Sequence, residues 1–151
     1  MKEINVNWNS SKGRMHLDAS SASGHLVEMD AAKEHGGDEE GFSPKMLLLV
    51  SLAGCTGMDV MSMLRKMRQD VTGYHLEVKG WEAEEHPKKF NRIVVEHVIE
   101  GHNLSQEMVN KAIKLSHEKY CGVSASLAGS VEIEMTSRLV ETGAGEESRA
   151  S

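Results

Sequence analysis

The chain of 151 residues is long enough for one domain with a short appendage and too short for two full-sized domains. Hydrophobic residues make up 39% of the chain and charged residues 26%, a composition that excludes a fibrous or wholly disordered protein. Its formal charge of −6, with His neutral, disfavours nucleic acid or an anionic membrane surface as a partner.

The start of the chain predicts a small sheet. Residues 1–9 lack the continuous apolar run of a secretory signal, so we expect a cytoplasmic protein with no membrane association. Apolar and polar residues alternate over 4–8 and 15–19, which predicts two short strands, and a weaker third is predicted over 25–30. Residues 31–41 are acidic and rich in Gly, and they predict a mobile loop.

A long apolar helix should follow. Ser43 can cap its first turn and Pro44 fits its first position. Residues 46–64 are apolar enough to suggest a membrane span, but an Asp at position 59 would be costly in hydrocarbon and favours a helix surrounded by protein. A chain of this length buries such a helix poorly on its own, so we expect a homodimer with a shared core.

The next segment predicts an antiparallel hairpin and a second helix. The hairpin strands are expected over 74–84 and 92–101. The helix is expected to run from its cap at Ser105 to about Tyr120. Its predicted buried face consists of Met108, Val109, Ala112, Ile113 and Ser116.

The end of the chain predicts a short helical turn as far as Ala128 and a last strand that begins at Val131. From residue 141 the chain is rich in Gly, Glu and Ser. We therefore expect a single domain over residues 1–140, followed by a flexible tail over 141–151.

Two cysteines are the main candidates for chemistry. Cys55 and Cys121 are too few for a secreted disulfide scaffold, which leaves redox chemistry, metal binding or inert burial. Asp59 follows Cys55 by one helical turn, and its charge would raise the pKa of the thiol, so a reactive Cys55 needs a nearby cation. The cations considered are Lys45, Lys66 and Arg14.

Cys121 lies between two predicted helices, where backbone N–H groups at a helix start would stabilise its thiolate. His117 could reach the same sulfur, or it could be an ordinary surface or core histidine. Cys55, Cys121, His117 and Asp59 are suitable zinc ligands by type, but no CxxC or HxxxH pair supports a zinc site. We therefore expect no metal. No nucleotide-binding or nucleophilic-serine motif is present either, so no cofactor is expected.

The order of these motifs resembles the OsmC/Ohr family of thiol-dependent hydroperoxide reductases. The resemblance rests on Ser43-Pro44, on Gly54-Cys55 at the end of an apolar stretch, and on the segment Lys119-Tyr120-Cys121-Gly122-Val123-Ser124. Within that family the chain is most similar to the YhfA-like branch. The resemblance implies an α+β fold over residues 5–140, in an intertwined homodimer with antiparallel sheets around two long central helices.

The same resemblance implies that Cys55 is the peroxidatic thiol and Cys121 the resolving thiol. It implies reduction of organic hydroperoxides in oxidative-stress defence, with a dithiol or lipoyl-type partner that restores the thiols. Better characterised members activate the first Cys with an Arg of the preceding loop and a Glu just after the Pro. Here Lys45 follows Pro44 and residues 31–42 contain no Arg, so Lys45 or His35 is the expected substitute.

Two alternatives stay open on the same dimer. One is a redox sensor that does not turn over. The other is a non-enzymatic module that binds a small hydrophobic ligand between the subunits, where the ten Met residues of the chain would supply an adaptable lining.

Overall fold

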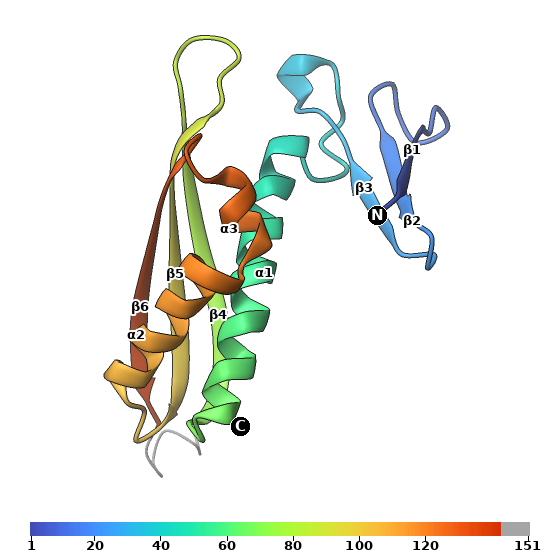
Figure 1. Cartoon of the computed structure of the whole chain (residues 1–151). Coiled ribbons are helices and arrows are strands. Elements are labelled where there is room, and N and C mark those ends of the chain that lie inside the picture. Colours follow the sequence, from blue (N-terminus) through green and yellow to red (C-terminus); the bar gives the residue numbers. More distant parts are fainter. Residues whose placement is uncertain (143–151) are drawn as a thin grey trace. The chain divides into compact units, whose positions relative to one another are not determined.

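The computed structural model describes residues 1–142, so the predicted tail lies outside the described residues except for its first two positions. The chain divides into two compact units, an N-terminal unit (Met1–Leu48) and a C-terminal unit (Leu49–Ser151). Figure 1 shows the elements of both. The prediction of one domain over residues 1–140 stays a prediction, although Glu141 still belongs to the last strand.

The N-terminal unit contains the three predicted strands. Strands β1 (Ile4–Trp8), β2 (Leu17–Ser21) and β3 (Leu26–Met29) form an antiparallel sheet in that order. After β3 comes a 3₁₀ helix, η1 (Lys33–His35), inside the segment that the sequence predicted to be a mobile loop.

Asp30 gives that loop a defined conformation. Its carboxylate accepts hydrogen bonds from the backbone N–H groups of Ala31, Asp38 and Glu40, at 2.8, 3.1 and 3.2 Å. Burial raises the pKa of Asp30, but these three amides outweigh it and hold the pKa below its ordinary value. The loop is therefore folded around an ionised carboxylate.

Helix α1 (Pro44–Lys66) begins where the sequence predicted, and Ser43 Oγ accepts a hydrogen bond from the Met46 N–H at 3.3 Å. It is the one helix in the described residues that is long and apolar enough to cross a membrane. As expected for a chain that buries such a helix poorly on its own, Leu52 and Leu64 are buried but Met58 is 72% exposed, and burial of the helix by a second copy stays a prediction. One sheet covers only one side of a helix.

The C-terminal unit is built on a mixed sheet. Strands β4 (Asp70–Glu82) and β5 (Phe90–His102) form the predicted antiparallel hairpin, and β6 (Glu132–Glu141) pairs with β5 in parallel. The expectation of purely antiparallel sheets is thus wrong here. The chain between β5 and β6 crosses the sheet through helices, and such a crossover returns the next strand in the same direction.

The crossover consists of helix α2 (Gln106–Leu115), a π-helical segment η2 (Ser116–Tyr120) and helix α3 (Gly122–Leu127). Ser105 caps α2 as predicted, and its Oγ accepts from the Met108 N–H at 3.3 Å. Of the predicted buried face, Met108 in the first turn of α2 is exposed, and the other four residues are buried.

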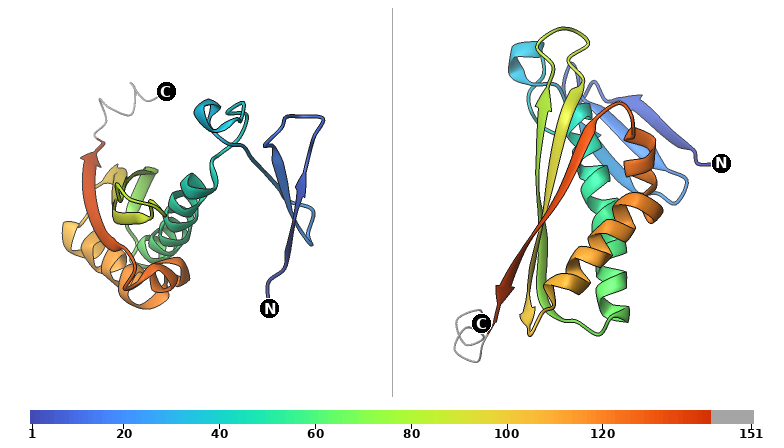
Figure 2. Two further views of the ribbon diagram at one scale, coloured as in Figure 1. Left: turned by 90° about the horizontal axis from the view of Figure 1, so that it is seen from above. Right: turned by 60° about the vertical axis from the view of Figure 1, so that its left-hand side comes forward.

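Helices α1 and α2 pack on the same face of the sheet (Figure 2). The core between them forms two apolar clusters, one around Val60, Leu64 and Ile99, the other around Leu52, Val95 and Cys121. The fold is a mixed α+β fold, as predicted. A single chain supplies one long central helix, so the second helix of the expected pair would belong to another copy.

Candidate functional site

The two cysteines, far apart in the sequence, come together in the C-terminal unit. Cys55 lies in the middle of α1 and Cys121 directly before α3, and both pack in the same apolar cluster. Both are free thiols, and Cys121 lies near enough to Cys55 to raise the pKa of the Cys55 thiol. Cys121 is buried, whereas Cys55 is partly exposed in the single chain.

Backbone amides in the first turn of α3 act on both sulfurs. Cys121 Sγ accepts from the Ser124 N–H at 3.3 Å, which confirms the predicted capping role of Cys121. The backbone N–H of Val123 lowers the pKa of the Cys55 thiol. Amides at a helix start stabilise negative charge, so the Val123 amide favours the thiolate of Cys55.

Other groups oppose ionisation of Cys55. Burial raises the pKa of the Cys55 thiol, the Val123 amide lowers it, and both Cys121 and Asp59 raise it. The net shift is upward, so Cys55 is a thiol at neutral pH within the C-terminal unit. This confirms the predicted effect of Asp59, and the need of a reactive Cys55 for a nearby cation stays a prediction.

A hydroxyl network fixes the segment that carries Cys121. Ser116 Oγ lies 2.9 Å from Asp59 Oδ2 and 3.0 Å from Thr56 Oγ1, and Thr56 and Ser116 are fully buried. The Cys121 N–H donates to the Ser116 carbonyl at 2.7 Å. The network therefore ties the π-helical turn η2 to α1 beside Cys55. The sequence signal for it was Thr56, a polar residue within the apolar helix.

The remaining predicted site residues have different surroundings. His117 Nδ1 lies 3.3 Å from Ser124 Oγ, so His117 contacts the residue whose amide binds Cys121 Sγ. A groove borders Asp59 and Lys66, and its other lining residues are Ser62, Met63, Met67, Leu115 and Tyr120. Lys45 and His35 belong to the N-terminal unit, and their role as activators stays a prediction.

A second buried polar pair lies in the same core. Tyr74 Oη is 2.6 Å from His97 Nδ1, and His97 Nε2 has no hydrogen-bond partner. Burial lowers the pKa of His97 to about 4 and raises that of Tyr74 well above its ordinary value, so both are neutral at pH 7. The sequence analysis did not single out this pair.

Comparison with known proteins places the chain in a family. Residues 36–136 match the family described as OsmC-like protein. Protein YhfA of Escherichia coli (strain K12) is 37% identical over 113 residues, which cover 75% of this chain and 81% of YhfA. The chain belongs to the OsmC-like family.

Solved structures agree with this assignment. A protein of Aquifex aeolicus VF5 superposes with a TM-score of 0.80 at 28% identity, covering 95% of this chain and 98% of that one. An organic hydroperoxide resistance protein OsmC from Legionella pneumophila superposes with a TM-score of 0.68 at 14% identity, covering 91% and 96%. The second likeness concerns the fold alone.

Proposed function

We propose that this OsmC-like protein is a two-cysteine hydroperoxide reductase in which Cys55 attacks the peroxide and Cys121 resolves the product. The observation that carries the proposal is the packing of the two thiols in one apolar cluster beside the start of α3. Their unequal exposure supports the assignment, because the attacking thiol has to be accessible and the resolving thiol does not.

The reaction balances with these two side chains and an external dithiol. The Cys55 thiolate attacks one peroxide oxygen, the O–O bond breaks, and the leaving oxygen takes up a proton to give an alcohol. Cys55 is then a sulfenic acid. The Cys121 thiol attacks its sulfur, an S–S bond forms, and water leaves. A dithiol or lipoyl-type partner reduces this disulfide by thiol exchange and is itself oxidised.

The groove beside Asp59 favours an organic peroxide over hydrogen peroxide. Met63, Met67 and Leu115 supply apolar surface in it beside its polar residues, and Asp59 lies one helical turn after Cys55. Apolar surface of this kind holds an alkyl or aryl group by burial, and hydrogen peroxide has no such group.

The exposed face of α1 supports a homodimer. Val50, Gly54, Met58 and Met61 follow one another at helical spacing, and the three side chains are exposed in the single chain. An added Cβ at Gly54 would meet nothing within 4 Å, so another backbone could approach closely there. Cys55 lies at the edge of this face, where a second copy could supply the missing cation.

The test is a single-turnover reaction of the reduced protein with cumene hydroperoxide and, separately, with hydrogen peroxide. We expect one intramolecular disulfide in the wild type, a trapped sulfenic acid in Cys121→Ser and no peroxide consumption in Cys55→Ser. Intact mass and thiol counting report each product. The double variant Cys55→Ser/Cys121→Ser is the blank, and circular dichroism checks that each variant is folded.

Other outcomes distinguish the alternatives. Equal reactivity of all four proteins would contradict the enzyme. A disulfide that forms once but is not recycled by dihydrolipoamide indicates a sensor. Saturable uptake of an apolar fluorescent probe by both single variants, without peroxide consumption by the wild type, indicates a ligand-binding module.

A further inference from the structure

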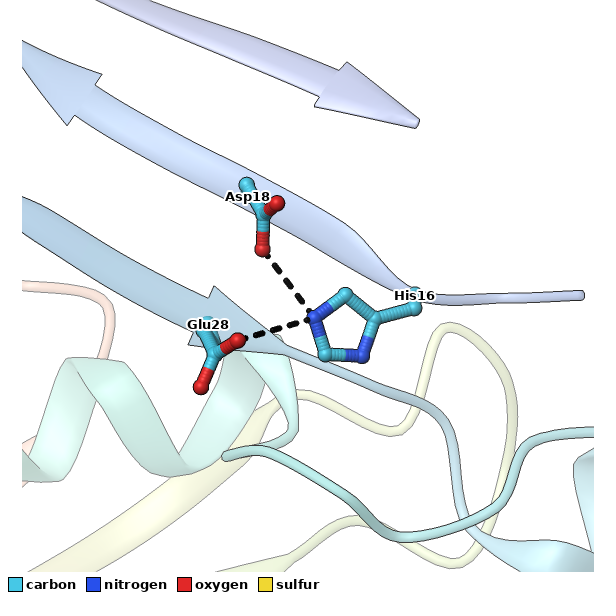
Figure 3. Close-up of side chains that lie close together, drawn as sticks. All are labelled: His16, Asp18 and Glu28. Carbon is cyan, nitrogen blue, oxygen red and sulfur yellow. Dashed lines mark hydrogen bonds and ion pairs between the residues drawn. The ribbon is translucent and has the colours of Figure 1, made fainter. Parts of the chain in front are cut away.

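Three potential metal ligands converge in the N-terminal unit, outside the thiol site. His16 Nε2 lies 3.0 Å from Asp18 Oδ1 and 3.4 Å from Glu28 Oε1 (Figure 3). Asp18 and Glu28 are paired across strands β2 and β3, and His16 precedes Asp18 by two residues, which places it on the same face. The register of the hairpin thus brings the three side chains together.

The spacing of the three atoms suits one metal ion. All of them lie within 4.8 Å of one another. Neighbouring ligands at about 2.1 Å from a common ion are about 3.0 Å apart in octahedral and about 3.4 Å apart in tetrahedral coordination. The two measured separations from His16 therefore require little movement of the side chains.

The imidazole is rigidly placed and surrounded by negative charge. His16 is only 1% exposed, and its Nδ1 has no hydrogen-bond partner. Asp30 also acts on it electrostatically. One cation offsets the two carboxylates of the cluster, because Lys12 Nζ is bound to Glu28 Oε1.

We propose that His16 Nε2, Asp18 Oδ1 and Glu28 Oε1 bind a divalent transition-metal ion, with Lys12 as the competing cation that leaves Glu28 when the ion binds. One imidazole nitrogen and two carboxylate oxygens suit Mn²⁺ or Zn²⁺, and water completes the coordination. The ion links β2 to β3, so the stability of the N-terminal unit increases as more of the site is filled with metal. This role is independent of the proposed peroxide chemistry.

Substitution of Lys12 distinguishes a metal site from a simple salt bridge, because the two predict different changes in metal affinity. If the cluster binds a cation, Lys12→Met removes a competitor and raises the affinity about two- to fivefold. If the cluster is only a salt bridge that ties the strands together, the same substitution removes a stabilising contact and has no effect on metal affinity.

The experiment uses the full chain in the Cys55→Ser/Cys121→Ser background, which removes the thiols as zinc ligands. Calorimetric titration with Zn²⁺ and electron paramagnetic resonance of added Mn²⁺ should each give one site per chain. Asp18→Asn and Glu28→Gln should each weaken binding at least about tenfold. Glu77→Gln is the matched control, because Glu77 Oε1 lies 3.4 Å from His75 Nε2 in an exposed pair elsewhere.

Several results would overturn the proposal. The first is that neither ion shows saturable binding. The second is that Asp18→Asn and Glu28→Gln bind the ion as tightly as the parent protein, or that Glu77→Gln loses as much metal affinity as they do. The third is that Lys12→Met does not raise the metal affinity. His16→Gln adds a direct test of the nitrogen ligand, with circular dichroism as the check on its fold. Because His16 is buried, the two carboxylate variants decide the question if His16→Gln is unfolded.

Discussion

In the C-terminal unit the fully buried side chains are mostly aliphatic, whereas the buried side chains of the N-terminal unit are those of His16 and Asp30. The apolar residues of the N-terminal sheet lie outside, with Ile4 and Leu26 64% and 71% exposed in the single chain. One unit is thus held by burial of aliphatic surface, and the other by hydrogen bonds, ion pairs and, as we propose, a metal ion.

This difference shows which unit buries its apolar side chains within its own chain and which does not. The C-terminal unit contains its own core and both cysteines. The N-terminal sheet has apolar side chains on its surface with nothing in the described chain that buries them, and exposed apolar patches of this kind mark interaction surfaces. It is also the unit that carries Arg14, Lys45 and His35, the cations that the sequence offered as activators of Cys55.

The largest effect should come from a matched pair of Leu substitutions. Leu64→Ala removes a side chain that is 1% exposed in the C-terminal core, and we expect it to lower the free energy of unfolding by about 2–5 kcal/mol. Leu26→Ala truncates an exposed side chain in β3, and in the isolated chain it should change that free energy by less than about 0.5 kcal/mol. Urea denaturation followed by circular dichroism measures both.

Protein concentration sharpens this comparison. If a second copy covers the N-terminal sheet, the effect of Leu26→Ala grows as the concentration rises, because the association contributes to stability. A large loss in Leu26→Ala at every concentration would show that the sheet has a core within its own chain, and the contrast between the two units would then be wrong.

Local patterns were enough to predict much of the fold. Alternation of apolar and polar residues predicted the first two N-terminal strands, the third was a weaker candidate, and Ser43 and Ser105 marked the starts of both longer helices. The parallel pairing of β6 was not predictable in this way, because the side chains of a strand alternate equally in parallel and antiparallel sheets. The folding of the loop around Asp30 depends on amides up to ten residues away.

The site was predictable to a similar degree. The residue types supplied Cys55 and Cys121, the resemblance supplied their expected roles, and helical spacing supplied Asp59. The contacts of Ser116 with Thr56 and of Tyr74 with His97 join elements far apart in the chain, and no local pattern shows them. The signal for the His16 cluster was present as a His and an Asp two residues apart, but Glu28 joins them only through the hairpin register.

His97 offers a pH-dependent test inside the apolar unit. Its pKa is lowered to about 4 in the folded state from an ordinary value of 6.5, so the unfolded chain binds the proton first as the pH falls. The stabilising contribution is complete above about pH 6.5 and is lost towards pH 4, at up to about 1.4 kcal/mol per pH unit. Urea denaturation at a series of pH values measures this slope.

His97→Gln should remove that part of the slope, since glutamine does not titrate. His75→Gln is the matched control on the neighbouring strand β4, where the histidine is exposed, and it should leave the part of the slope that His97 contributes in place. A wild-type slope equal to that of His97→Gln between pH 4 and 6.5 would mean that water reaches the imidazole and that the polar centre of this core is not sealed.

The smallest expected effect concerns Asp59 and tests whether the C-terminal unit alone controls its thiol. Asp59→Asn keeps an oxygen for Ser116 but removes a charge that raises the pKa of Cys55. That pKa should fall, and iodoacetamide should alkylate Cys55 about threefold faster at pH 7. The rate is measured against pH in the Cys121→Ser background, with Ser62→Ala as the uncharged control on the same side of α1.

The direction of the change in alkylation rate shows whether Asp59 holds a cation beside the sulfur of Cys55. A faster reaction means that Asp59 acts on Cys55 without compensation, as it does within the C-terminal unit. A slower reaction in Asp59→Asn means that Asp59 holds a cation beside the sulfur, because loss of the carboxylate would then release that cation. Adding Lys45→Met to this variant, and Arg14→Gln separately, would then show whether the N-terminal unit supplies it.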